Sequence, residues 1–175
     1  MKEINAKREN FSCKALLKQK ILDGVLIADN NQTRIISHLD DLSKIVGEKC
    51  NKKKLFRPLL SFIRRNKPSE TLNRGIYLFG GVGTGKTMLM DLFFDCLAIK
   101  KKTRVHFHKF MQDTHTAINF ARSNGSSDPI IEVADHLAES TSLLCFDELQ
   151  ITDITDAMIV GRLFARLIEL DIFLV

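Results

Sequence analysis

The fold is decided by one stretch of sequence, Gly80-Gly81-Val82-Gly83-Thr84-Gly85-Lys86-Thr87, which lies between the apolar runs 76–79 and 88–94. Its spacing follows the pattern G-x-x-x-x-G-K-[ST] of a phosphate-binding loop, which is expected between a strand and a helix. A triphosphate is held mainly by backbone N–H groups, and these converge on an anion only where glycines let the chain curl tightly. The sequence therefore predicts a nucleotide-binding loop that opens a helix.

The residues of this loop have separate expected roles. The first turn of the helix should direct its unpaired N–H groups at the phosphates, and the Lys86 ammonium should contact their β- and γ-oxygens during catalysis. The Thr87 hydroxyl should contact Mg²⁺. The alternative, a glycine-rich turn that matches by accident, is disfavoured by the flanking strand and helix patterns. The predicted nucleotide-binding residues are Gly80, Gly81, Val82, Gly83, Thr84, Gly85, Lys86, Thr87 and Met88.

A second candidate group follows the apolar run 143–146, which ends in Asp147 and Glu148. The run is too densely apolar for a half-exposed strand, so it predicts a buried parallel strand, and α/β sheets place their ligands at the carboxyl ends of such strands. We predict that Asp147 holds Mg²⁺ through water and that Glu148 polarises the attacking water. Two acids after a strand are often only a solvated turn, but the phosphate loop upstream favours the catalytic interpretation.

Helix and strand patterns alternate after residue 70. Strands are expected at 76–79, 103–107 and 142–146 and again from Ile172, and helices after the loop, at 111–122, from Pro129 and at 153–170. This alternation predicts an α/β fold with a mainly parallel sheet covered by helices on both faces. Residues 11–48 show short amphipathic helical patterns. We therefore predict a helical N-terminal region with a basic linker over 1–70 and a nucleotide-binding domain over 71–175.

Composition narrows the class of protein. The chain has 175 residues, 45% of them hydrophobic and 27% charged, with a net charge of +5, as expected of a soluble protein with one core and a small helical appendage. No apolar run approaches a membrane span and no leader pattern is present, which favours the cytoplasm. The basic stretch 49–67 could meet acidic lipid or nucleic acid, although a solvated linker is the favoured interpretation.

Cysteines and histidines are the residues most able to bind zinc. The cysteines show no paired metal spacing and are interpreted as reduced, packing residues: Cys13, Cys50, Cys96 and Cys145. His106 and His108 should face one side of the strand expected at 103–107, with His115 on the next helix. No cysteine or carboxylate lies nearby at ligand spacing, so packing or hydrogen bonding is favoured over zinc.

Several segments together resemble the ZapE family of AAA+ ATPases, which occur in the bacterial cytoplasm and in mitochondria. The similarity extends from about Ala15 to Val175 and rests on the loop with its following helix, on 104–111 with His115, on Leu144 to Glu148, and on 151–163. The resemblance implies a P-loop NTPase core of three αβα layers, with ATP rather than GTP as the nucleotide and Mg²⁺ as the metal. It also implies that Glu148 and Lys86 are the catalytic residues.

The resemblance carries expectations about setting and partners. Bacterial members are linked to cell division and mitochondrial members to quality control at the inner membrane, and the absence of a leader favours the bacterial cytoplasm. A protein partner is therefore expected, with a homo-oligomer for the full-length protein and peripheral membrane association as an option. Nucleic acid is not expected as a partner. A helicase-loader-like ATPase that acts on DNA through the stretch 49–67 is the alternative.

Family members continue past Leu174 into parts that this sequence lacks: a γ-phosphate sensor, an arginine finger, a fifth strand and a helical lid. The strand from Ile172 should lie between the phosphate-loop strand and the Asp147 strand. We therefore expect a fragment or a degraded gene product, with an AAA+ core incomplete at the C-terminus. Slow hydrolysis, or a nucleotide-binding module without turnover, follows as a further alternative.

Overall fold

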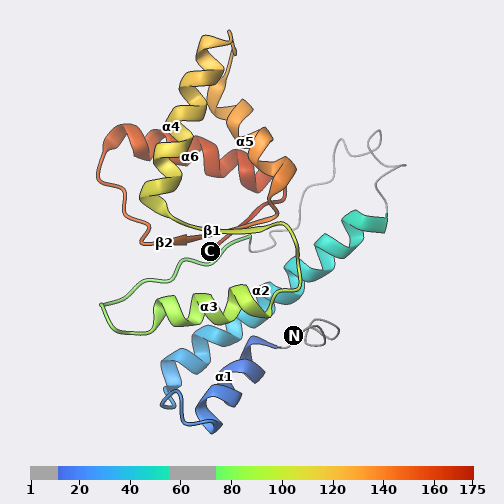
Figure 1. The fold of residues 1–175 in the computed structure, drawn as a ribbon, viewed down its shortest axis with the longest axis vertical. Coiled ribbons are helices and arrows are strands. Elements are labelled where there is room, and N and C mark those ends of the chain that lie inside the picture. The colour runs from blue at the N-terminus through green and yellow to red at the C-terminus, as the bar shows by residue number, and fades with distance from the viewer. Residues whose placement is uncertain (1–11, 56–73) are drawn as a thin grey trace, which may run out of the picture. The chain divides into compact units, whose positions relative to one another are not determined.

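The computed structural model describes residues 12–55 and 74–175, and side chains for 12–50 and 74–175 (Figure 1). The chain divides into two compact units, one ending at Lys100 and the other beginning at Lys101. The domain boundary predicted near residue 70 lies outside the described residues, as does most of the basic stretch 49–67. The two units are taken in turn.

Three helices form the described part of the first unit: α1 (Cys13–Leu22), α2 (Asn30–Leu55) and α3 (Lys86–Cys96). They pack on one another through apolar residues at helical spacing, because such residues fall on one side of each helix. The break expected at Asp23 and Gly24 is present, and Gly24 has a φ of +71°. The buried side chains include Leu17, Ile36, Leu39, Leu42, Val46, Leu89, Leu92 and Phe93.

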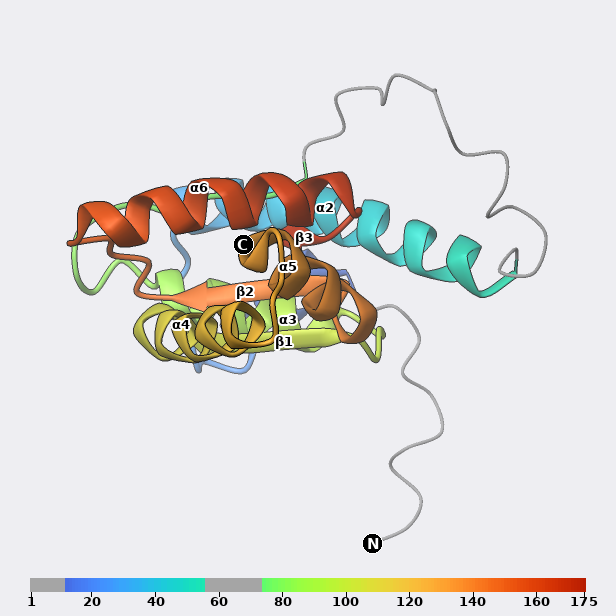
Figure 2. The same cartoon turned by 90° about the horizontal axis from the view of Figure 1, so that it is seen from above.

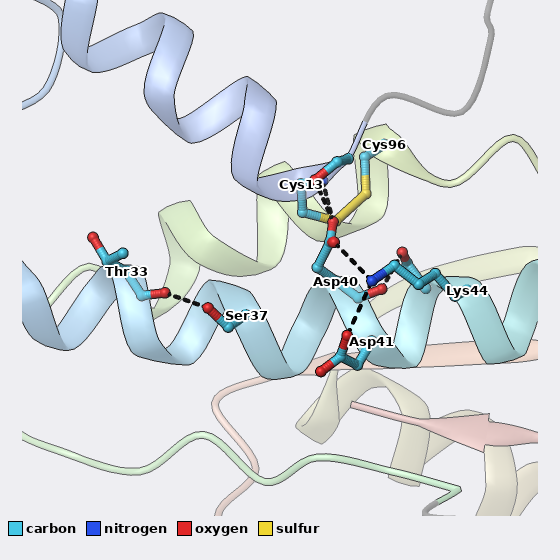
Figure 3. Close-up of polar contacts among 9 residues, drawn as sticks. Cys13, Thr33, Ser37, Asp40, Asp41, Lys44 and Cys96 are labelled. Atoms are coloured by element: carbon cyan, nitrogen blue, oxygen red, sulfur yellow. Dashed lines mark hydrogen bonds and ion pairs between the residues drawn. A yellow bond between two sulfur atoms is a disulfide. The ribbon is translucent and has the colours of Figure 1, made fainter.

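A buried carboxylate from α2 caps the start of α1 (Figure 3). Asp40 Oδ1 accepts hydrogen bonds from Ser12 Oγ at 2.8 Å and from the Cys13 N–H at 2.6 Å, so an acid on another helix serves the N-terminus of α1. Lys44 Nζ lies 3.4 Å from Asp40 Oδ2. Burial alone would raise the pKa of Asp40, but the hydrogen bonds from Ser12 and Cys13 and the nearby Lys44 outweigh it and hold the pKa below its usual 3.8.

A disulfide joins Cys13 to Cys96, and thus the first residue of α1 to the last residue of α3 (Figure 3). Their Cα atoms are 5.7 Å apart, within the range that a disulfide spans. The prediction of reduced cysteines is therefore wrong for this pair, whose 83-residue separation leaves no local pattern to detect. Cys50 and Cys145 are free. Burial of Cys145 raises the pKa of its thiol to about 12, in keeping with a packing role.

The strand expected at 76–79 is not formed. Within the described ranges, residues 76–79 belong to no helix or strand, and the Tyr77 and Phe79 side chains are 67% and 82% exposed. An extended segment becomes a strand only when a neighbouring backbone shares its hydrogen bonds. An isolated β-bridge at Gly75 is the only pairing assigned within 74–79, so the ladder does not extend into the segment.

The second unit contains six elements in the order strand, helix, helix, strand, helix, strand. They are β1 (Lys102–His106), α4 (Phe107–Ser123), α5 (Pro129–Ser140), β2 (Leu143–Asp147), α6 (Ile154–Glu169) and β3 (Phe173–Leu174). The sheet order is β1-β2-β3 and both pairings are parallel. The α/β fold and the parallel sheet are confirmed, and the last strand lies beside the Asp147 strand as expected.

Figure 1 shows α4, α5 and α6 on one side of β1 and β2, and Figure 2 shows the same helices lying over the strands. The core between them is built around Phe146, whose ring centroid lies 4.9 Å from that of Phe110 and 5.4 Å from that of Phe164. All of Leu143 to Phe146 is buried, as expected for a central strand. One helical layer belongs to this unit, so the three-layer arrangement stays a prediction.

Two helices of this unit begin where the sequence indicates. Asp128 accepts a hydrogen bond from the Ile131 N–H, with Pro129 at the first helical position, and Asp153 accepts one from the Thr155 N–H at 2.6 Å. Within 12–55 and 74–175, no helix combines the length and the apolar character that a membrane crossing requires.

Candidate functional site

The predicted phosphate loop forms a tight curl that ends in α3. Gly83 and Gly85 have φ values of +81° and +84°, in the left-handed region where a side chain would strain the backbone. Gly85 is the N-cap of α3 and supplies no side-chain cap, so the N–H groups of the first turn are not taken up by the residue that precedes them. The dipole of α3 and these donors favour an anion at this end.

The carbonyl groups of the loop are held from within. Lys86 Nζ donates to the carbonyl oxygens of Gly80 at 2.9 Å and of Gly81 at 2.7 Å, and Thr84 Oγ1 donates to the Gly81 carbonyl at 3.0 Å. The structure thus brings Gly80, Gly81, Thr84 and Lys86 together within the loop, and their role in nucleotide binding stays a prediction. Val82 and Thr87 are exposed and Met88 is half-buried, and the predicted contact of Thr87 with Mg²⁺ stays a prediction.

One residue at this loop was missed by the sequence interpretation. Gln32, in the first turn of α2, donates a hydrogen bond from Nε2 to the Thr84 carbonyl oxygen at 3.3 Å. The only local signal was Asp29 three positions earlier, which marks the start of a helix but says nothing of what the helix contacts. A contact across 52 positions has no sequence pattern of its own.

The predicted acids lie at the carboxyl end of β2. Asp147 is the last residue of the strand, and Glu148 follows it with a φ of +55°, a left-handed conformation that is uncommon for residues other than glycine. Glu148 is exposed, and its side chain is accessible to water. Strained residues of this kind gather at functional sites, which favours a role for Glu148 beyond filling a turn.

Asp147 forms a two-pronged ion pair that the sequence interpretation also missed. Arg104 Nε lies 2.8 Å from Asp147 Oδ2 and Arg104 Nη2 lies 3.0 Å from Oδ1. Both side chains are mostly buried. The guanidinium comes from β1, where Arg104 is in register with Cys145, two residues before the acid. This fork geometry fixes the plane of the carboxylate and satisfies part of its charge.

The prediction that His106 and His108 face one side of a strand is wrong. His106 ends β1, whereas His108 already lies in α4, because that helix begins at Phe107. His108 Nε2 is 3.1 Å from Gln112 Nε2, and His115 Nε2 is 2.7 Å from Asp156 Oδ1. Two of the three therefore make the hydrogen bonds that the sequence interpretation favoured.

The loop and the acids belong to different compact units. Gly80 to Met88 lie in the unit that ends at Lys100, and Asp147 and Glu148 in the unit that begins at Lys101. The loop offers backbone N–H groups, an ammonium and a hydroxyl, a donor set that suits phosphate and its metal. The strand end offers a mostly buried, paired carboxylate and an exposed one.

Comparison with known proteins agrees with this chemistry. Residues 11–175 match the model of the AFG1-like ATPase family. The chain is 44% identical over 112 residues to the cell division protein ZapE of Escherichia coli, an alignment that covers 64% of this chain and 29% of ZapE. It is also 44% identical over 111 residues to lactation elevated protein 1 homolog B of Danio rerio, covering 58% of this chain and 22% of the relative.

The chain thus spans less than a third of the length of these curated relatives. No solved structure matches it significantly. The family model, by contrast, takes in nearly all of the chain, including the phosphate loop, the strand that ends in Asp147 and Glu148, and the described helices of both units. The chain therefore belongs to the AFG1-like ATPase family.

Proposed function

We propose that this chain binds ATP with Mg²⁺ and forms the nucleotide-binding part of a protein that hydrolyses ATP. The observation that carries the proposal is the curled glycine loop at the N-terminus of α3, found in a chain of an ATPase family. Such a loop has few uses other than holding phosphate groups. Mg²⁺ would supply charge neutralisation at the phosphate oxygens.

Different groups of the loop contact the phosphates and the metal in this proposal. The backbone N–H groups of Gly80 to Met88 surround the phosphates, and Lys86 exchanges its two carbonyl partners for phosphate oxygens. Because those carbonyls hold the Lys86 ammonium at the loop beforehand, little side-chain entropy is lost on binding. The hydroxyl of the exposed Thr87 would contact the metal.

The two acids carry the later steps of the proposal. Asp147, whose carboxylate plane Arg104 fixes, would hold the water shell of Mg²⁺, and the exposed Glu148 would orient and polarise the attacking water. The fold in which both groups serve one nucleotide is the three-layer AAA+ core, where ligands bind at the carboxyl ends of parallel strands. This finer assignment rests on the family and on the sequence pattern.

The setting is proposed from the relatives. One of them is a cell division protein of a bacterium, so we place the whole protein in the bacterial cytoplasm, where it remodels a protein partner during division as a homo-oligomer. A mitochondrial setting, peripheral membrane association and a DNA-associated role through residues 49–67 are the alternatives. A nucleotide-binding module without turnover is one more alternative.

Two substitutions test the proposal. Lys86→Ala should abolish ATP binding measured by isothermal titration calorimetry, whereas Lys109→Ala, which removes an exposed lysine paired with Asp113, should leave it unchanged. Glu148→Gln should retain binding and lose phosphate release. Undiminished binding by Lys86→Ala would defeat the assignment of the loop. Binding without any phosphate release, in the unchanged chain and in Glu148→Gln alike, would favour the module without turnover.

A further inference from the structure

The Gln32 side chain extends from a stretch of backbone that hydrogen bonds hold in place. Asp29 Oδ1 accepts hydrogen bonds from the N–H groups of Asn31 at 2.7 Å and Gln32 at 3.0 Å, and the Asp29 carbonyl accepts from both the N–H and the hydroxyl of Thr33. These bonds satisfy the N–H groups of Asn31, Gln32 and Thr33 in the first turn of α2. The Gln32 side chain is half-buried, and its amide group therefore projects from a defined position.

The amide group of Gln32 lies against the phosphate loop. Its Nε2 donates to the Thr84 carbonyl at 3.3 Å, and a β-carbon placed on Gly85 would come within 2.8 Å of the same nitrogen. Only glycine at position 85 leaves room for this approach. All of these residues belong to the first compact unit.

The contact acts on one peptide group of the loop. A trans peptide is planar and directs its C=O and its N–H to opposite sides, and no described peptide bond is cis. A donor that holds the Thr84 carbonyl therefore also fixes the direction of the Gly85 N–H, which points away from Gln32. Lys86 holds the Gly80 and Gly81 carbonyls in the same way, but it must release them to reach phosphate. Gln32 can keep its bond throughout.

We propose that Gln32 is a positioning residue for nucleotide binding, which holds the peptide between Thr84 and Gly85 so that the Gly85 N–H faces a bound phosphate. This inference rests on the proposed function of the loop. It makes the start of α2 a working part of the nucleotide site. The role depends on the donor, since a neutral amide neither repels phosphate nor competes with Lys86 for it.

The test replaces the donor and keeps the shape. Gln32→Met retains the length of the side chain without a donor, and it should weaken ATP and ADP binding by the same factor of about five, the usual effect of losing one neutral hydrogen bond. Gln32→Glu should weaken both further, because a carboxylate repels phosphate and cannot donate. Asn31→Ala removes the neighbouring, exposed carboxamide and should leave both affinities unchanged.

A spectroscopic readout separates positioning from a structural role. In ¹⁵N-labelled protein, Gln32→Met should shift the Gly85 amide resonance while the thermal midpoint of unfolding stays within about 2 °C of the parent, a shift too small for a core defect. An unchanged Gly85 resonance with unchanged affinity would overturn the inference, as would a fall in affinity that tracks a fall in the midpoint. If the unchanged chain binds no nucleotide, the proposed function itself fails, which is a different result.

Discussion

At the scale of the residue, Glu148 couples backbone geometry to chemistry. Its left-handed φ of +55° costs a residue with a side chain on the order of 1–3 kcal/mol, and the neighbouring fold holds it there. A glycine would adopt the same conformation at lower cost. The strained conformation at Glu148 thus lowers the stability of the fold, and it places an exposed carboxylate directly after the buried strand β2.

Glu148→Gly should therefore raise the free energy of unfolding by about 1 kcal/mol, since it relieves the strained φ, while it abolishes ATP turnover. Urea denaturation and a phosphate-release assay measure the two effects. Asp171 has a similar φ of +65° and lies after α6, so Asp171→Gly should leave turnover unchanged. Loss of stability together with retained turnover in Glu148→Gly would contradict the role given to this residue.

Asp40 is a residue whose charge supports the fold. Its pKa is lower in the folded chain than the usual 3.8, so its contribution to stability is present above that value and is lost as the pH falls through the folded pKa. Unfolding midpoints recorded between about pH 2 and pH 6 should therefore decline at the acid end. In Asp40→Asn the midpoint should be lower at neutral pH and the acid decline shallower. Asp41→Asn, a change at the exposed neighbour, is the matched control.

At the scale of the element, the N-terminal helices are held by more than apolar packing. The Cys13–Cys96 bridge closes a loop of 83 residues and ties α1 to the end of the helix that the phosphate loop opens. Cys13 is fully buried and Cys96 is 9% exposed, so the bridge lies inside the packed helices. The attachment of α1 includes a covalent bond that reduction would break.

Cys96→Ala should lower the free energy of unfolding by roughly 2–4 kcal/mol under oxidising conditions, because the cross-link restricts the unfolded chain. With excess dithiothreitol the unchanged chain should lose most of this advantage. Cys50→Ala removes a free cysteine and should behave like the unchanged chain in both conditions. Equal unfolding curves for Cys96→Ala and the unchanged chain without reductant would show that the bridge does not contribute.

The elements also show which signals a sequence carries. Helices with an apolar side and a capping acid, such as those begun by Asp128 and Asp153, were predicted within a few residues, because cap and periodicity are local. The segment 76–79 was predicted as a strand and is not one, since strand formation depends on a neighbour elsewhere in the chain. His108 was assigned to a strand because the start of α4 at Phe107 has no side-chain cap to mark it.

At the scale of the whole molecule, features with a local sequence signal could be predicted, and contacts between distant residues could not. The curl of the phosphate loop and the acid-bearing strand follow from glycine spacing and apolar density, and both could be predicted. Arg104 beside Asp147, Gln32 beside Thr84 and Cys13 bonded to Cys96 could not, because each joins residues more than 40 positions apart. Long-range pairs are fixed by the packing of whole elements, which a single sequence does not encode locally.

The parallel order β1-β2-β3 gives β2 a neighbour on each edge, and its residues Leu143 to Phe146 are buried. Amide protons in such a strand reach solvent only when the surrounding unit opens as a whole. In deuterium oxide, the amide protons of β2 should therefore exchange more slowly than those of any other part of residues 101–175. The amide protons of the two-residue β3 should exchange faster than those of β2. The carboxylate of Asp147 is carried at the end of the segment that opens least often, and thermal fluctuation elsewhere in the unit will scarcely displace it.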